Sequence, residues 1–562
     1  MNATSVDSYS PNTSLPGIPV DKDDKLLEAI GVHRELSREF TSWSTISFAL
    51  SILGCVASIA STFNTPLLYG GPAAAVWSWF MGSWGCLAIA VSVAELVSAY
   101  PSSSGVYGAP LICAPPLLFS IVLDYPRITV VGQLATPASV NFAGALMIFA
   151  AVTISTDGSF VPSTGQVLGL YCGINILMGI YNSLPSKILD KMFKYWMWIN
   201  LLTSLAVIIA VPAGASHKGI LASSKFVWTE VVDGTGWGNA PFAFLLGILS
   251  VQWVMTDYDG AAHLAEEVKN AAVIAPVAIV IAVISTGFIG FWINVALCYG
   301  IQDLSALPGA TGLVFSQILW DSLGKRGALA LWSFVIIIQV FTGLACQLAC
   351  IRSIYAVSRD GAFPDRKLMA KVWGVTKTPV NAAIFTVVIQ CLFGLLYLIS
   401  YVAINAVFSI TAVALDVSYM IPTIGKLYLY FYPSEHVKFV PGPFYLGKWG
   451  YVINVYAILW TLFETGILIM PQVRPVTANT MNYAGPIMGG TVLVSGIWYI
   501  IYGVSFSFLS MALLYFWRTY RPASAVVGGM VRSPDAPLQG AEKGTWDSEE
   551  KTSQDKGKVE CQ

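Results

Sequence analysis

The sequence predicts a polytopic α-helical membrane protein with about twelve transmembrane helices. Of its 562 residues, 56% are hydrophobic and only 11% are charged, whereas an ordinary soluble domain has roughly 25% charged residues. Apolar runs near the ~20 residues that a helix needs to cross a bilayer recur from Trp43 to Trp517. Such runs must be buried in lipid and against one another, so the lipid bilayer is an expected partner.

Length and hydrophobicity place the beginnings of the spans. The spans near Val380 and Tyr401 are separated by almost no loop, around Ser400. The first residues are polar and lack the pattern of a signal peptide. The predicted starts lie near Trp43, Ala73, Ile128, Gln166, Phe193, Phe242, Val273, Ala328, Val380, Tyr401, Tyr451 and Gly485.

The distribution of Lys and Arg predicts the orientation. With the N-terminus in the cytoplasm, most basic residues fall in cytoplasmic segments, as the positive-inside rule requires, and both termini are then cytoplasmic. The two ends are rich in Ser, Asp, Lys and Gly and predict disorder. The expected division is therefore a tail over 1–42, a transmembrane domain over 43–517 and a second tail over 518–562.

The first span is interrupted by small polar residues. Ser51, Gly54 and Ser58 lie within the run TISFALSILGCVASIASTF. One interpretation is a helix break that presents backbone N–H and C=O groups to a ligand. The other is a face of small residues that packs against a neighbouring helix.

The sixth span contains acidic residues near the middle of the membrane. Residues Thr256 to Gly260 lie about fourteen residues into an apolar segment that starts near Phe242. A carboxylate there costs at least ~2.5 kcal/mol in lipid, so it should face a cavity or a partner. Paired interruptions in two halves of a chain indicate a midplane site. The alternative is a helix that ends at Asp257, with Asp259 to Glu267 at the cytoplasmic interface.

Other polar residues lie within apolar spans. His263, Glu266, Glu267 and Lys269 are expected at the cytoplasmic interface in either case. Asp416 is a second intramembrane acid, with either a role in transport or a hydrogen bond to a neighbouring helix. Gln133, Asn141 and Gln347 are candidates for pocket lining or, preferably, interhelical hydrogen bonds. Cys346 and Cys350 lie one helical turn apart, which indicates packing rather than a metal site.

The motif Tyr258-Asp259-x-x-Ala262-His263-x-x-Glu266-Glu267-x-Lys269-Asn270-Ala271 resembles the sixth-span signature of fungal permeases in the amino acid-polyamine-organocation superfamily. The similarity is strongest to the amino acid/choline group, which includes the GABA and choline permeases. Further matches run along the chain. They are Phe48 to Gly54, Gly70-Gly71-Pro72, Ala94 to Pro101, Asn182 to Pro185, Ser358 to Pro364 and Met481 to Ala484.

The resemblance implies a LeuT-like fold of two inverted five-helix repeats plus two helices, with spans one and six unwound around the substrate. It implies that Ser51, Ile52, Leu53, Gly54 and Cys55 offer backbone groups to a substrate carboxylate. It implies that Thr256, Asp257, Tyr258 and Asp259 form the opposite wall. It also implies proton symport, for which Asp257, Asp259 and Asp416 are the candidate coupling residues.

The chain departs from the family pattern in places. The family more often has Gly where this chain has Asp257, and Ser where it has Ala261. The added carboxylate could favour a cationic substrate or carry a proton. The segment from Gly108 to Arg127 is proline-rich and lacks the family's aromatics, which indicates either a reshaped entry to the third span or a local error in the gene model.

The expected function is import of an amino acid or a related amine such as GABA, driven by an ion gradient because the chain has no P-loop. Alternatives are transport of choline, for which Trp253, Tyr258 and Trp332 are candidate aromatics, transport of a polyamine, and a non-transporting nutrient sensor. An enzyme or a channel is not expected, nor are a cofactor, a metal or nucleic acid. The plasma membrane is the expected location, with vacuolar or other endomembranes as alternatives. The oligomeric state is not predicted.

Overall fold

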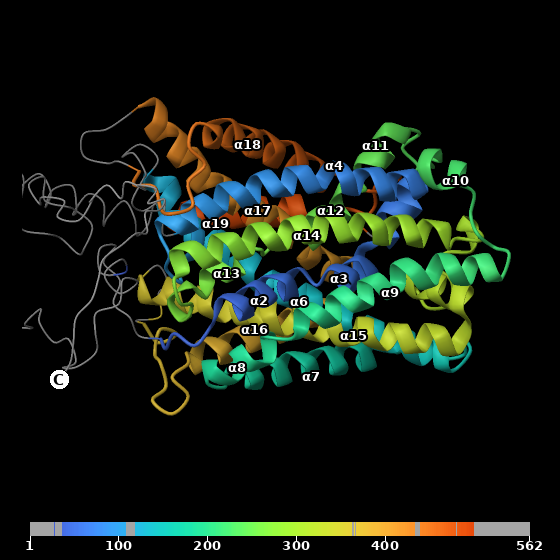
Figure 1. Ribbon diagram of the computed structural model, residues 1–562, viewed down its shortest axis with the longest axis horizontal. Helices are drawn as coiled ribbons and strands as arrows, with labels where there is room; N and C mark the ends of the chain where they lie inside the picture. The colour runs from blue at the N-terminus through green and yellow to red at the C-terminus, as the bar shows by residue number, and fades with distance from the viewer. Residues whose placement is uncertain are drawn as a thin grey trace, which may run out of the picture.

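The computed structural model describes residues 27, 36–107, 119–361, 365, 367–432, 439–478 and 480–498. In these ranges the chain is helical, and the one β-bridge pairs Phe40 with Val268. Ten helices there are long and apolar enough to cross a membrane, and two shorter apolar helices span Ala240–Val254 and Ala484–Val494. Together these correspond to the predicted spans, and they lie along the long axis of one bundle (Figure 1).

The helices follow the predicted order along the chain. They are α2 (Ser42–Leu53), α3 (Cys55–Thr62), α4 (Asn64–Ala99), α6 (Phe119–Ser155), α7 (Thr164–Asn182), α8 (Ser186–Phe193), α9 (Trp196–His217), α10 (Ser224–Thr229), α11 (Ala240–Leu245), α12 (Ile248–Val254), α13 (Gly260–His263), α14 (Ala271–Tyr299), α15 (Val314–Arg359), α16 (Val380–Ile399), α17 (Tyr401–Phe431), α18 (Trp449–Leu468) and α19 (Ala484–Trp498).

Three helices begin well before the predicted start of their span: α6 starts at Phe119 rather than near Ile128, and the other two bend close to the predicted start. The second span was expected near Ala73, but α4 starts at Asn64 and bends at Gly71, whose φ is 82°. The eighth was expected near Ala328, but α15 starts at Val314 and bends at Gly324, whose φ is 74°. In both cases the leading segment contains glycine or charged residues, so hydropathy alone places the start of the helix too late.

The short junction at Ser400 separates two spans, as predicted. The backbone of Ser400 is extended, with a φ of −167°. Its hydroxyl accepts a hydrogen bond from the Ala403 N–H at 3.0 Å, which caps the start of α17. The chain therefore reverses direction within a single residue between α16 and α17.

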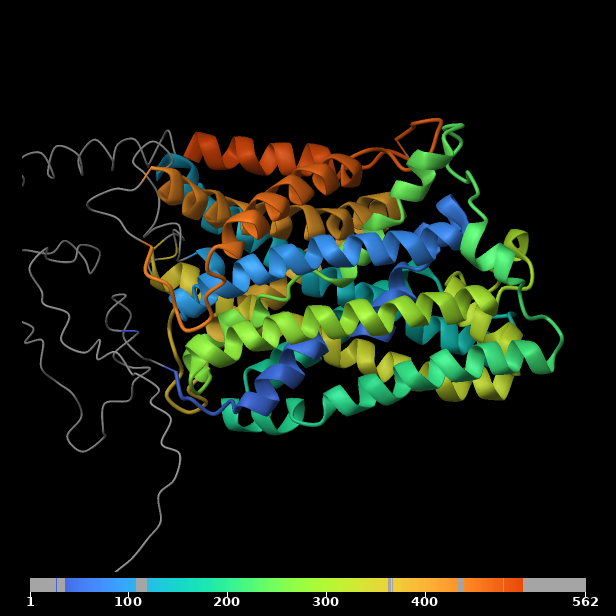
Figure 2. The same ribbon diagram turned by 45° about the horizontal axis from the view of Figure 1, so that its top comes forward.

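The two ends of the bundle differ in their elements. Helices α10 and α11 lie at one end, and α8, α13 and the start of α2 lie at the other (Figures 1 and 2). The predicted tails, except for residues 27 and 36–42 of the first, lie outside the described residues, as does 108–118 of the atypical segment before α6. The broken helices α2/α3 and α12/α13 run through the middle of the bundle.

Candidate functional site

The first span is broken at Gly54. Helix α2 ends at Leu53 and α3 starts at Cys55, with Gly54 between them at φ 47° and ψ 43°. A Cβ atom on Gly54 would lie 1.9 Å from the Thr342 Oγ1 of α15. Only glycine fits both this left-handed backbone and this close approach. The break is therefore present, and it coincides with the tight helix packing that the second interpretation of this segment predicted.

The break leaves backbone groups at the start of α3. The first N–H groups of a helix have no acceptor within it, so those of Cys55 and Val56 are free of intrahelical bonds. The Gly54 carbonyl accepts from the N–H groups of Ala57 and Ser58, both at 2.9 Å. The Ser51 hydroxyl donates locally to the Ser47 carbonyl at 2.7 Å. The groups that this break offers are thus mainly backbone groups.

The sixth span is broken between Val254 and Gly260. Helix α12 ends at Val254, and one helical turn, α13, forms again from Gly260 to His263. Asp257 lies between them in the left-handed region, with a φ of 61°. The alternative in which this helix runs on to Asp257 and stops there is wrong, because the helix ends three residues earlier and resumes after the break.

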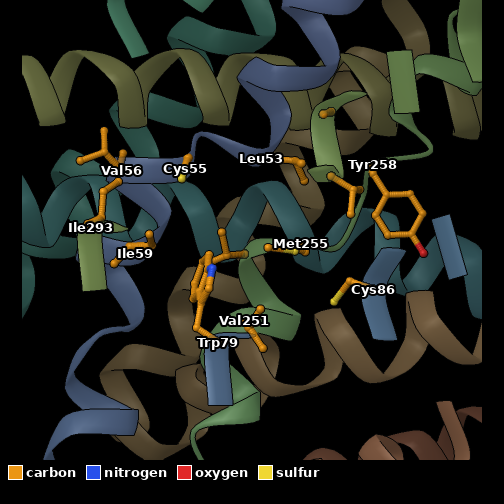
Figure 3. Packing of buried hydrophobic residues seen from close by; sticks show 14 of the residues in the cluster. Leu53, Cys55, Val56, Ile59, Trp79, Cys86, Val251, Met255, Tyr258 and Ile293 are labelled. Atoms are coloured by element: carbon orange, nitrogen blue, oxygen red, sulfur yellow. The ribbon is translucent and has the colours of Figure 1, made fainter. Parts of the chain in front are cut away.

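The two breaks lie against each other in the middle of the bundle. A Cβ atom on Gly260 would lie 2.3 Å from the Ile52 Cδ1. Figure 3 shows Leu53 and Cys55 beside the first break, and Met255 and Tyr258 from the second, in one buried cluster. The paired interruptions therefore form a single region, as the sequence predicted.

Side chains from other helices hold the two aspartates of the second break. The Gln133 Nε2 of α6 donates to the Asp257 Oδ1 at 2.7 Å. The Tyr419 hydroxyl of α17 donates to the Asp259 Oδ1 at 2.5 Å. The His263 Nε2 lies 3.3 Å from the Asp259 Oδ2. Each aspartate thus accepts one hydrogen bond from another helix; the second oxygen of Asp257 has no hydrogen-bond partner, and that of Asp259 lies beside His263.

Four consecutive residues of this break carry buried polar atoms without a hydrogen-bond partner. They are Thr256 Oγ1, Asp257 Oδ2, Tyr258 OH and Asp259 Oδ2. Buried polar groups are normally paired, and each unpaired one costs about 1–3 kcal/mol. A run of four at a helix break indicates a place for a polar ligand that accepts and donates hydrogen bonds. The indole N–H of Trp253 is also unpaired.

His263, Glu266 and Glu267 are buried, which corrects the expectation that they line an interface with water. Glu266 accepts from the Arg359 Nη1 at 2.8 and 2.9 Å. Glu267 pairs with the Arg352 Nε at 2.5 Å. These ion pairs join the α13 segment to the end of α15, and Lys426 of α17 forms a further ion pair with Glu95 of α4. Lys269 is exposed, as expected.

The Arg partners lie 85 and 93 residues further along the chain from Glu267 and Glu266. Spacing within the sixth span therefore gave no sign of these pairs. The single signal was that Glu266, Glu267 and the Ser358-Arg359-Asp360 loop belong to matching family motifs.

Asp416 lies in a second buried polar group beside the break. Its Oδ2 accepts from the Gln252 Nε2 of α12 at 2.8 Å, and the Cys86 thiol approaches the Gln252 Oε1 at 3.2 Å. The Asp416 carboxyl also interacts with that of Glu464 on α18. Sequence reasoning missed Glu464, although an acid within the apolar run WTLFETGIL was a usable signal.

The neutral polar residues form interhelical hydrogen bonds, which the sequence favoured over pocket lining. The Asn141 Nδ2 donates to the Asn175 Oδ1 at 2.8 Å. The Gln347 Nε2 donates to the Gln390 Oε1 at 2.8 Å. Gln133 reaches the second break itself. The indole of Trp332 is also engaged, because its N–H donates to the Met147 carbonyl at 2.9 Å.

Comparison with known proteins places this geometry in context. A family described as amino acid permease matches residues 40–494. An uncharacterized amino-acid permease of Schizosaccharomyces pombe is 38% identical over 482 residues, which cover 85% of this chain and 88% of the relative. The GABA-specific permease of Saccharomyces cerevisiae is 30% identical over 488 residues, covering 85% and 84%. A putative polyamine transporter of Candida albicans is 32% identical over 497 residues, covering 86% and 88%.

The fold is also similar to that of a solved transporter. The crystal structure of MhsT in complex with L-phenylalanine has a TM-score of 0.50 and 13% identity, over 75% of this chain and 97% of that one. This similarity concerns the fold alone. It agrees with the LeuT-like architecture that the motif resemblance implied.

Proposed function

The chain belongs to the amino acid permease family, and from that membership and the site geometry we propose that it imports an amino acid or a related amine such as GABA by proton symport. It is a transporter rather than an enzyme. The observation that carries the proposal is the pair of facing helix breaks, where four consecutive residues, 256–259, have buried polar atoms without partners. Alternating access would expose this region first to one side of the membrane and then to the other.

The first break is proposed to hold the carboxylate of the substrate. The start of α3 at Cys55 supplies free N–H groups and the positive end of a helix dipole. The backbone from Ser51 to Gly54 completes this wall. Because its nearby side chains are mostly apolar, this wall would recognise a feature that amino acids and GABA share rather than the side chain of one of them.

The second break is proposed to hold the ammonium group. Asp257 Oδ2 and Thr256 Oγ1 are buried acceptors without donors, and Asp259 Oδ2 has only the ion-pair contact with the His263 Nε2 at 3.3 Å. An ammonium group has N–H donors that could satisfy them, and its charge would offset that of the aspartates. Tyr258 packs on Tyr419, with ring centroids 5.1 Å apart, and would close the wall between the two aspartates.

A polyamine is the second candidate. Its several ammonium groups would suit the two aspartates without a carboxylate at the first break. Choline is less well supported, since a quaternary ammonium has no N–H for the free carboxylate oxygens. It would need an aromatic cage, and the ring of Trp332, one of the expected aromatics, packs against Phe315 with ring centroids 5.9 Å apart.

The proposed location is the plasma membrane, with both termini in the cytoplasm. The support for this orientation is the positive-inside distribution of Lys and Arg in the sequence. In this orientation the end with α8 and α13 faces the cytoplasm, and the ion pairs of Glu266 and Glu267 lie on the inner side of the site. Protease protection of tags at either terminus in sealed vesicles would test the orientation.

Uptake into a permease-deficient yeast tests the function. We expect accumulation of radiolabelled GABA or another amino acid that a protonophore abolishes. Choline and a polyamine are assayed in parallel, and preferential accumulation of either would replace the amino acid as substrate. Correct surface expression with accumulation of none of these compounds would contradict the transport proposal.

The substitution Asp257→Gly tests the role of the second break. Glycine fits the φ of 61° without strain and removes the carboxylate. We expect selectivity to shift away from cationic substrates, or the pH dependence of uptake to be lost if Asp257 carries the proton.

Asp157→Gly is the matched control, because Asp157 also has a positive φ, of 51°, but is exposed at a loop. The control should leave selectivity and pH dependence unchanged. If Asp257→Gly behaves like the control in both respects, Asp257 has neither role.

A further inference from the structure

A second acidic site lies beside the two breaks, between α17 and α18. Asp416 and Glu464 are both fully buried, and their carboxyl groups interact directly. The Gln252 amide donates to one oxygen of Asp416 at 2.8 Å. The other oxygen of Asp416 and both oxygens of Glu464 have no hydrogen-bond donor. Three of the four oxygens of this pair are therefore buried and unpaired.

No basic residue compensates the pair within the described part of the chain. None of the ion pairs found there includes Asp416 or Glu464. The groups that interact with the pair, by element, are Cys86 of α4, Gln252 of α12, Tyr258 and Asp259 of the sixth-span break, and Trp460 of α18. The indole N–H of Trp460 does not complete a hydrogen bond.

Binding of a single proton relieves the electrostatic repulsion within this carboxyl pair. Two ionised carboxylates in contact repel each other, and burial adds the cost of removing both from water. One proton bound to the pair reduces its charge from −2 to −1. The resulting O–H can donate to an unpaired oxygen of the other carboxyl.

We propose that Asp416 and Glu464 form a carboxyl pair that binds one proton, and that this pair is the proton site of the transport cycle, separate from the substrate-binding residues. This inference rests on the proposed function, since it assigns the coupling ion of that function to a place. It adds Glu464, which lies outside both breaks, to the transport machinery.

The pair is connected to the second break in two ways. Gln252, which bonds to Asp416, lies two residues before the end of α12 at Val254. Tyr258 interacts electrostatically with Asp416, Glu464 and Asp259. Gain or loss of the proton therefore changes both the charge that the break experiences and the hydrogen bond that holds α12.

Purified protein in proteoliposomes separates proton coupling from substrate binding. The variants are Glu464→Gln and Asp416→Asn, and the probe is radiolabelled GABA. In a one-to-one symport, a gradient of one pH unit supports about tenfold accumulation, because a tenfold ratio equals about 1.4 kcal/mol. We expect both variants to lose this accumulation and to retain GABA exchange at equal pH within about threefold of the wild type.

Thr461→Val is the matched control. Thr461 is buried on α18 one turn before Glu464. This variant should keep both accumulation and exchange. Gradient-driven accumulation in Glu464→Gln at the wild-type level would overturn the proposal. A parallel loss of accumulation and exchange would also overturn it, because it would assign the pair a structural role.

If the proposed function itself is wrong, the wild-type protein gives a different result in these assays. If the wild type exchanges GABA but does not respond to the pH gradient, proton symport is wrong, and so is the proton site. If the wild type does not carry GABA, infrared spectroscopy tests the pair directly. A band from a protonated carboxyl should then titrate with pH in the wild type, and its frequency and titration midpoint should shift in both variants, because each leaves a single buried carboxyl in place of the pair. Absence of the band from the wild type, or an unchanged frequency and midpoint in both variants, would refute the shared proton.

Discussion

Each of the two helix breaks has a residue in the left-handed region, but the two breaks present different chemical groups. The first depends on Gly54 in the left-handed region, lies against Thr342 and presents mostly backbone groups. The second places Asp257 in the left-handed region and presents the side chains of Thr256 to Asp259. Under the proposed function, the first break would bind a feature common to the whole class of substrates, and the second would set the choice among them.

A left-handed residue other than glycine is tolerated only when something compensates for it. Asp is among the side chains that adopt this conformation most readily. At Asp257 the hydrogen bond from Gln133 adds a contact that glycine could not make. Glycine, which the motif resemblance implies is more usual at this position, would fit the same backbone. On that comparison, Asp257 adds a carboxylate without requiring a different bend.

The largest expected effect is that of Gly54→Ala. Alanine would adopt a φ of 47° and would place its Cβ 1.9 Å from the Thr342 Oγ1. The left-handed conformation costs roughly 1–2 kcal/mol and overpacking about 1–3 kcal/mol. We expect transport to be lost and the thermal unfolding temperature in detergent to fall clearly.

The double variant Gly54→Ala/Thr342→Ala removes the clash but not the backbone strain, so it should recover part of the loss. Gly466→Ala is the control, because a Cβ there meets nothing within 4 Å and Gly466 lies within helix α18. A Gly54→Ala variant with wild-type stability would show that the first break is not rigid.

Hydropathy was sufficient to predict the spans, because a bilayer imposes one length on every helix that crosses it. The first break could be predicted from Gly54, which weakens a helix where the surrounding residues are apolar. The bend at Asp257 could not be predicted from composition, since nothing local requires a left-handed Asp. The family's glycine at this position was the one available hint.

The partners of the acids were harder to predict than the acids. Gln133 and Tyr419 lie 124 and 160 residues from the aspartates that they contact. A single sequence carries no record of such distant contacts. Burial of His263 was missed for the same reason, because its environment is built by Asp259, Gln133 and the Ser103 carbonyl 3.1 Å away.

An intermediate effect is expected for Tyr419→Phe, which tests whether the second break depends on its side chains. The variant removes the 2.5 Å hydrogen bond to the Asp259 Oδ1 but keeps the ring that packs on Tyr258. An unpaired buried acceptor costs about 1–3 kcal/mol. We expect weaker substrate binding, measured as a higher KM, with a smaller loss of stability than Gly54→Ala causes.

Tyr171→Phe is the control for the loss of a buried tyrosine hydroxyl, because Tyr171 donates to the Gln390 carbonyl in another part of the bundle. That variant should lower stability and leave KM unchanged. Equal KM values for Tyr419→Phe and the wild type would mean that Asp259 is held without this bond.

The smallest expected effect is that of Gly260→Ala, which tests whether the two breaks act as one unit. The new Cβ would lie 2.3 Å from the Ile52 Cδ1 and 3.1 Å from the Ala349 Cβ. The nearest atom is the end of a flexible side chain that can rotate away, so we expect a loss of stability near 1 kcal/mol, at the low end for overpacking.

Ile52→Val removes that methyl group from the first break and should recover the stability that Gly260→Ala loses. The double-mutant cycle, read from unfolding temperatures and from KM, should give a coupling of at least about 0.5 kcal/mol, as for residues in contact. Additive effects would mean that the breaks respond independently, and recognition of the carboxylate and of the ammonium group would then be separable by mutation.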